Sequence, residues 1–254
     1  MIIILQGIFL NRTYLKFTFH KVYTLKLIIF YIVISKFNFF VKKLTSSIIN
    51  LFKLNKWLIN VIPGILVIGF FYTFTFISLA FYPSPFNPVN NWLSELGNSS
   101  LNPNGAFLYN LGCILTGSAL FPFYISMYKF YRKEIYHKIA VISIQILGFF
   151  SAFALIMLGV YSQDFSIPHM IWSGAFFWLN LWVLVGANLA LIFHKHFMKP
   201  IAIYGWFAAA INFLFVLLTI SMVNSPLLEW ISVSTALGYV ALIIFNIYKN
   251  RSKF

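Results

Sequence analysis

The chain has 254 residues, of which 61% are hydrophobic and only 9% are charged, and its formal net charge is +14. Because about a quarter of the residues of a soluble domain are charged, this composition excludes a soluble globular protein. The excess of Lys and Arg would indicate nucleic-acid binding in a soluble protein, but in a membrane protein it follows from the enrichment of both residues in cytoplasmic loops. We therefore expect membrane lipids as partners, and no nucleic acid.

The first segment, residues 1–56, carries half of the Lys and Arg residues of the chain. Residues 22–41 could form an additional spanning helix, although Lys26 and Lys36 interrupt the run. The segment could instead lie in the interface, with its lysines against anionic headgroups. A third interpretation is that translation starts further along, at a non-Met codon. We favour an interfacial or peripheral segment, and we expect no cleaved signal peptide because no basic region precedes the first apolar run.

The second segment, residues 57–254, contains six apolar runs. Each run has about the 20 residues that a helix needs to cross the hydrocarbon layer. The runs are 61–81, 106–128, 139–161, 169–193, 201–223 and 229–248. The predicted fold is therefore an all-α, polytopic membrane protein with a six-helix transmembrane bundle.

Positive charge alternates between successive connections of the predicted bundle. The flanks and connections on one side contain Lys and Arg throughout, whereas the connections 83–105, 162–168 and 224–228 contain neither. Lys and Arg collect on the cytoplasmic side of membrane proteins. We therefore expect a multi-pass protein of the cell membrane, with both ends of the six-helix core in the cytoplasm and the three Lys- and Arg-free connections on the outer face.

The longest polar and turn-rich stretch of the chain is the connection 83–105. Asn87 can cap a helix that has Pro88 at its first position and Gly97 just past its end. This pattern predicts a short outer-face helix at about 88–96, which would act as a lid on the bundle.

Three of the four acidic residues of the chain fall on the predicted outer side: Glu95, Asp164 and Glu229. His169 is the only candidate cation there. Each carboxylate could simply face water. Alternatively, Glu95, Asp164 and His169 converge as the polar core of a ligand-binding site, where such groups could bind a divalent metal, a cationic headgroup or a proton. The supporting residues of that site would be Asn91, Ser94 and Glu229.

No motif in the sequence assigns a reaction or a cofactor. A metal-ligand spacing such as H-E-x-x-H is absent, and Ser94 is not in a G-x-S-x-G elbow. The single cysteine, Cys113, excludes an intrachain disulfide framework and a cysteine-based zinc site. Whether the protein is an enzyme, and which cofactor or metal it uses, therefore stays open.

The segment NNWLSELGNSS, followed by NPNGAFLYNLGCILTG, LGVYSQD and PHMIWSGAFF, resembles an archaeal and bacterial membrane family, domain of unknown function 998. The resemblance covers about 57–248 and is most specific from 83 to 177, and residues 1–56 fall outside it. The matching residues are Asn91, Ser94, Glu95, Leu96, Gly97, Asn102, Gly105, Asn110, Gly112, Gly117, Asp164 and His169. The family is similar in layout to the six-helix Frag/DRAM/Sfk proteins, some of which are linked to lipid remodelling or organisation. The resemblance therefore implies a six-helix fold and no established reaction.

Three functions are compatible with these patterns. The leading hypothesis is an outer-leaflet site for a lipid headgroup or another small polar ligand. The first alternative is a non-catalytic protein that organises lipids or scaffolds a partner. The second alternative is a small-molecule transporter, which needs a polar path through the bundle, and the residues to check for such a path are Asn110, Gln145, Asn180 and Asn212.

Overall fold

The computed structural model describes residues 56–252, and these residues form helices and their connections without a strand. The predicted first segment, residues 1–56, lies outside the described part except for Lys56, with which α2 begins. The long helices are α2 (Lys56–Ala80), α3 (Ala106–Ser126), α4 (Ile135–Val160), α5 (Ser166–Leu191), α6 (Lys199–Ile220) and α7 (Pro226–Lys249). Two short 3₁₀ helices, η1 (Leu93–Gly97) and η2 (Met127–Phe130), lie in the connections.

All six long helices are long and apolar enough to cross a membrane. The predicted six-helix membrane bundle is therefore confirmed for the described residues. The helix bounds agree with the apolar runs to within a few residues, except that α2 begins five residues and α4 four residues before its run.

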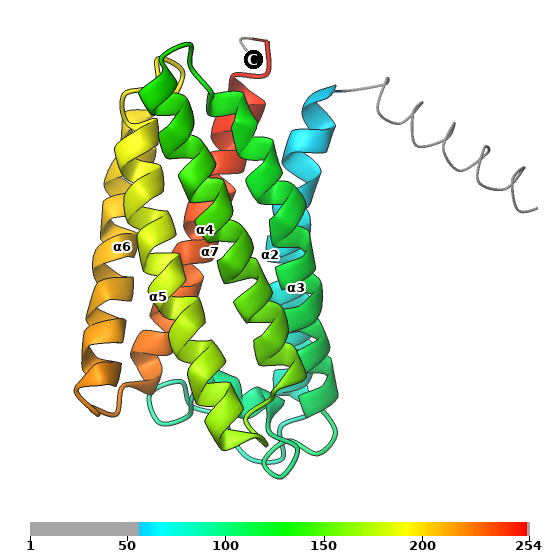
Figure 1. The fold of residues 1–254 in the computed structure, drawn as a ribbon. Coiled ribbons are helices and arrows are strands. Elements are labelled where there is room, and N and C mark those ends of the chain that lie inside the picture. Colours follow the sequence, from blue (N-terminus) through cyan, green and yellow to red (C-terminus); the bar gives the residue numbers. More distant parts are fainter. Residues whose placement is uncertain (1–55, 253–254) are drawn as a thin grey trace, which may run out of the picture. The chain divides into compact units, whose positions relative to one another are not determined.

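The helices run up and down beside one another, so that neighbours in the chain are neighbours in space (Figure 1). Helix α2 also packs against α7, and this contact closes the order α2 to α7 into a ring. Helix α6 packs less closely against α5 and α7 than α3 packs against its two neighbours. The contacts of α5 with α6, α6 with α7 and α7 with α2 are all looser than those among α2, α3, α4 and α5.

The connections gather at two ends of the bundle. We call one end the capped end; it comprises residues 81–105, 161–165 and 221–225, and none of them is Lys or Arg. The other end, which we call the basic end, comprises residues 127–134 and 192–198 together with the start of α2 and the end of α7 (Figure 1). The alternation of charge that the sequence predicts is thus a division between two ends of one bundle.

Small residues allow α3 and α4 to approach closely. A Cβ atom added at Gly117 would lie 2.8 Å from the carbonyl oxygen of Ala152, and one added at Gly159 would lie 2.5 Å from that of Asn110. Glycine at such positions lets helix backbones come together in membranes. These contacts fix the position of α4 against α3 and, with it, one wall of the space inside the ring.

Candidate functional site

The connection 81–105 folds across the capped end as a lid, but its helix is shorter than predicted. The side chain of Asn87 accepts a hydrogen bond from the backbone N–H of Val89 (3.0 Å). The backbone carbonyl of Asn87 accepts one from the backbone N–H of Asn91 (2.8 Å). This turn is a separate unit, because Trp92 is extended (φ −64°, ψ 144°) before η1 begins at Leu93. The predicted helix at about 88–96 was therefore wrong in its start, although Asn87 does have a capping role.

Buried hydrogen bonds hold the lid against the bundle. The side-chain amide of Asn102, which is fully buried, donates to the hydroxyl of Ser78 on α2 (3.0 Å) and to the carbonyl of Leu96 (3.0 Å). The amide of Asn110 on α3 donates to the carbonyl of Gly97 (3.0 Å). Since buried polar groups without partners are costly, these pairings fix η1 in one position above the ring.

Glu229, in the first turn of α7, also anchors η1 to the bundle. Its carboxylate accepts a hydrogen bond from the backbone N–H of Leu93 at 2.7 Å, and the backbone and hydroxyl of Ser94 also bond to it. The side chain is only 6% exposed. A carboxylate in the first turn also interacts favourably with the helix dipole, so Glu229 has structural reasons for its place.

The other two acids of the capped end have local partners. Asp164 is exposed and accepts hydrogen bonds from the N–H and hydroxyl of Ser99 (2.9 Å each) and from the hydroxyl of Ser162 (2.8 Å). Partial burial acts to raise the pKa of Asp164, but these hydrogen bonds outweigh it and lower the pKa below its usual value. Asp164 thus ties the lid to the connection between α4 and α5.

Glu95 points its carboxylate at groups of the lid itself. It accepts a hydrogen bond from the side-chain amide of Asn91 (2.8 Å). Burial, followed by the charge of Glu95 and a hydrogen bond to it, raises the pKa of Tyr82. Among the described residues, no hydrogen bond or ion pair joins Glu95 or Asp164 to His169, and no group of three or more His, Cys, Asp or Glu residues is arranged to hold a metal.

His169 lies at the start of α5 and faces the inside of the ring. Its Nδ1 is 3.0 Å from the carbonyl oxygen of Tyr161, and because a carbonyl only accepts, Nδ1 donates and Nε2 is left for another partner. Within the described part of the chain, Nε2 has no hydrogen bond. Of the six predicted site residues, the structure brings three together around the same hollow: Ser94, His169 and Glu229.

That hollow has a wide part, which we call the lateral pocket, between α5 and α6 at the capped end. Its volume is about 480 Å³, within the range of roughly 300–1,000 Å³ that is usual for ligand sites. Its apolar walls are Trp92, Met170, Phe177, Trp178, Phe215, Val216 and Ile220. Its polar lining is Ser94, Gln163, His169, Ser173, Thr219 and Glu229.

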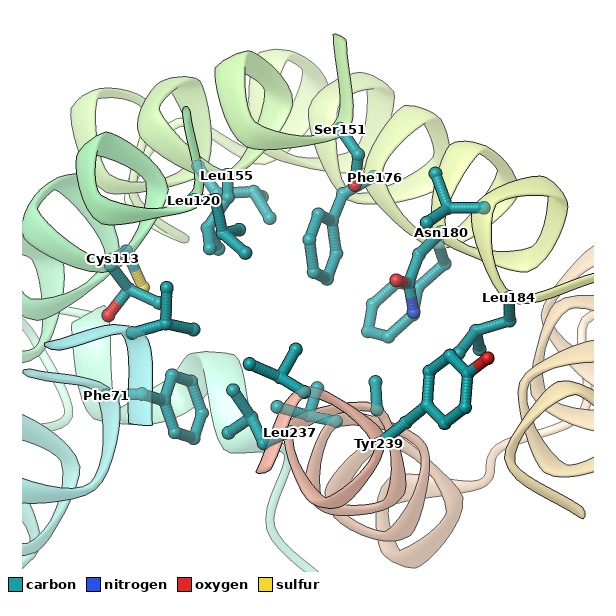
Figure 2. Close-up of a pocket in the computed structure, with 18 of the residues that line it drawn as sticks. Phe71, Cys113, Leu120, Ser151, Leu155, Phe176, Asn180, Leu184, Leu237 and Tyr239 are labelled. Carbon is teal, nitrogen blue, oxygen red and sulfur yellow. The ribbon is translucent and has the colours of Figure 1, made fainter. Parts of the chain in front are cut away.

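A smaller interior cavity of about 90 Å³ lies inside the ring, and the lateral pocket adjoins it. Side chains from α2, α3, α4, α5 and α7 line it, and α6 contributes none (Figure 2). The two hollows share five residues, which are Ser94, His169, Ser173, Phe177 and Glu229. The three predicted site residues therefore stand where the lateral pocket meets the interior cavity.

Only one of the four residues proposed for a transport path lines this cavity. Asn180 points into it (Figure 2). The other three bond within the fold: Asn110 to Gly97, Gln145 to the carbonyls of Tyr124 and Ile125, and Asn212 to Ser232. Sequence reasoning did not assign Ser151 or Thr116 to the site, although their hydroxyls interrupt apolar helices and both residues line the cavity.

The comparisons with known proteins agree with this architecture. Neither the curated proteins nor the solved structures gave a match to the chain. A family model does match, over residues 65–246, which include nearly all of the six-helix bundle and the whole lid. The chain therefore belongs to the family described as protein of unknown function (DUF998), and it is a multi-pass membrane protein.

Proposed function

We propose that this protein binds an amphiphilic lipid at its capped end, with the headgroup at Ser94, His169 and Glu229 and the hydrocarbon tail in the lateral pocket. One observation carries the proposal: an apolar, aromatic pocket ends at three hydrogen-bonding side chains from three different elements. Ligand sites commonly combine apolar walls with a few converging polar groups.

The tail has an entrance from the side of the bundle. Met170 on α5 and Ile220 on α6 border the lateral pocket and are 66% and 69% exposed. Both helices are apolar enough to lie in a membrane, so these exposed side chains would face lipid close to the capped end. A lipid could therefore enter between α5 and α6 without displacement of the lid.

The polar residues favour a headgroup that donates hydrogen bonds, such as a hydroxyl or an ammonium group. Glu229 offers a carboxylate and His169 offers Nε2, and both can accept a hydrogen bond. The connections of the capped end supply no Lys or Arg to neutralise a phosphate. A headgroup that presents only an anion would therefore find no Lys or Arg of these connections to pair with.

The division of charge supports an orientation for this site. Because Lys and Arg concentrate on the cytoplasmic side, we place the basic end, with Lys133 and Lys195, in the cytoplasm. The capped end then faces outward, and the lipid comes from the outer leaflet of the cell membrane.

A matched pair of glycine substitutions tests the proposal. Gly174 lines the lateral pocket, and Gly69 faces outward on α2; a Cβ atom added at either position meets nothing within 4 Å. Gly174→Leu places a large side chain in the lining of the pocket, at a position with open space for its Cβ atom, and Gly69→Leu makes the same chemical change elsewhere. Native mass spectrometry of the purified proteins should detect bound lipid in the wild type and in Gly69→Leu, and several-fold less in Gly174→Leu.

Equal lipid occupancy in Gly174→Leu and the wild type would contradict a tail in the lateral pocket. The scaffold alternative expects a different result, in which substitutions in the lid change assembly and leave the bound lipid unchanged. Comparing lipids with hydroxyl, ammonium and phosphate headgroups in the same experiment tests the expected headgroup preference.

A further inference from the structure

We propose that the interior cavity contains a second binding site, formed by Thr116, Ser151 and Asn180, for a small uncharged molecule that carries hydroxyl groups. This site is separate from the lipid site and does not depend on it. Its residues come from three helices, α3, α4 and α5, and all of them line the interior cavity and none the lateral pocket.

The first argument is that the polar atoms of these residues lack partners. The hydroxyls of Thr116 and Ser151 are buried and have no hydrogen bond to any described residue. The side chain of Asn180 is only 9% exposed, points into the cavity (Figure 2), and makes no hydrogen bond within the described part of the chain. Buried polar groups are nearly always paired, so three unpaired groups around one cavity indicate a polar occupant.

The second argument is depth. At a rise of about 1.5 Å per residue, Ser151, Thr116 and Asn180 lie roughly 13, 15 and 21 Å along their helices from the capped end. These depths are near the middle of a hydrocarbon layer that is about 30 Å thick. The three groups span about 8 Å along the bundle, which suits a chain of two or three hydroxyl groups.

The third argument is the chemistry of the lining. Hydroxyl and amide side chains both donate and accept hydrogen bonds, as the hydroxyls of a polyol do. Apart from Glu229 and His169 at the junction with the lateral pocket, no ionisable acid, histidine or basic residue lines the cavity in the described structure. A charge at this depth is costly without a counter-charge, so the occupant is uncharged.

A hydrocarbon tail is the wrong occupant for this space. It would leave all three polar groups without hydrogen bonds, which is unfavourable for buried groups. The cavity of about 90 Å³ exceeds the roughly 10–15 Å³ that one water needs by this measure. It therefore has room for several waters, or for one molecule of the size of glycerol in their place.

Ligand-observed saturation-transfer NMR with glycerol tests the site, using the full chain in lipid nanodiscs and empty nanodiscs as the blank. We expect a glycerol signal from the wild type and no comparable signal from glycerol phosphate. Ser151→Ala should weaken glycerol binding roughly fivefold to tenfold, the effect of one lost hydrogen bond. Asn180→Leu, which removes two hydrogen-bonding atoms, should abolish the signal.

Ser118→Ala is the matched control for Ser151→Ala. The hydroxyl of Ser118 is exposed on α3 and bonds to the carbonyl of Ile114 in its own helix at 2.8 Å, so its loss should leave the glycerol signal unchanged. Gly174→Leu should also keep the signal, because it blocks only the lateral pocket. No glycerol signal from the wild type, or equal signals from the wild type, Ser151→Ala and Asn180→Leu, would overturn the inference, whatever the result for lipid.

Discussion

At the scale of single residues, Glu229 combines two roles. It accepts the N–H of Leu93, a residue 136 positions away in the chain, and it borders both hollows. Its contact with η1 joins the lid to α7. The side chain that we place beside the headgroup therefore also holds the lid in position. The proposed site therefore predicts that a ligand bound at Glu229 is coupled to the position of the lid.

Replacing this carboxylate should loosen the lid. Glu229→Leu leaves the buried N–H of Leu93 without an acceptor, which costs about 1–3 kcal/mol of folding stability. Glu229→Gln keeps an acceptor oxygen and should cost less. Thermal unfolding in detergent measures both effects, with Glu134→Gln as the control, because Glu134 is exposed at the basic end and such changes usually stay within about 0.5 kcal/mol. Equal stability of Glu229→Leu and the control would contradict the anchoring role.

Asp164 should make the stability of the capped end depend on pH in the acidic range. Its folded pKa is lower than that of the unfolded chain because Ser99 and Ser162 bond to the carboxylate and outweigh the opposing effect of burial. The stabilisation is therefore complete above the unfolded pKa, about 3.9, and is lost as the pH falls through the lower folded pKa.

Asp164→Asn removes that titration. Between pH 5 and roughly pH 3, the melting temperature of the wild type should fall more steeply than that of Asp164→Asn. Parallel curves would show that the hydrogen bonds of Asp164 do not contribute to stability in this range.

The members of the candidate site could be named from the sequence, but their grouping could not. The absence of Lys and Arg around Ser94, His169 and Glu229 marked them as a set. Glu95 and Asp164 share that feature, yet each bonds within or beside the lid. Their directions depend on turns fixed by distant hydrogen bonds, and residue type and spacing carry no information about those bonds.

At the scale of elements, hydropathy predicted the long helices correctly, but it did not predict the short helix η1 of the lid. An apolar run in a membrane must form a helix because its backbone groups have no other partners, so α3 to α7 follow from composition. The lid lies outside that constraint, and local hydrogen bonds at Asn87 compete with helix formation there. The cavity was also beyond prediction, since it depends on which side chains meet across the ring.

The close contact of α3 with α4 gives a prediction at this scale. Gly159→Ala would place a Cβ atom 2.5 Å from the carbonyl oxygen of Asn110, so the two helices must separate. Overpacking of this kind costs about 1–3 kcal/mol. Gly174→Ala has open space and should be neutral or stabilising by up to about 1 kcal/mol, since Ala favours helix. In thermal unfolding, the melting temperature of Gly159→Ala should therefore fall clearly below that of the wild type. The melting temperature of Gly174→Ala should stay the same or rise.

At the scale of the whole molecule, the proposed sites and the positive charge lie in different parts of the bundle. The lateral pocket lies beside α6, which packs less closely against its two neighbours than α3 does, at the end without Lys or Arg. The opposite end carries the positive charge, and the side chains of Met127, Phe130 and Leu191 near it are fully buried. The interior cavity shares Ser94, His169 and Glu229 with the lateral pocket at the capped end and extends to Met127 at the basic end. The proposed lipid site therefore lies at the end of the bundle that lacks Lys and Arg.

The proposed orientation of this bundle, with the capped end outside the cell, can be tested with single cysteines. Cys113 is buried and is the only cysteine of the chain, so Cys113→Ser provides a background without thiols. Ser100→Cys and Lys133→Cys then place one thiol each in an exposed connection of the capped end and of the basic end. A membrane-impermeant maleimide added to intact cells should label Ser100→Cys and spare Lys133→Cys, and both should react after the cells are opened. The reverse pattern would place Glu229 and the lateral pocket on the cytoplasmic side, so that the lipid would have to come from the inner leaflet.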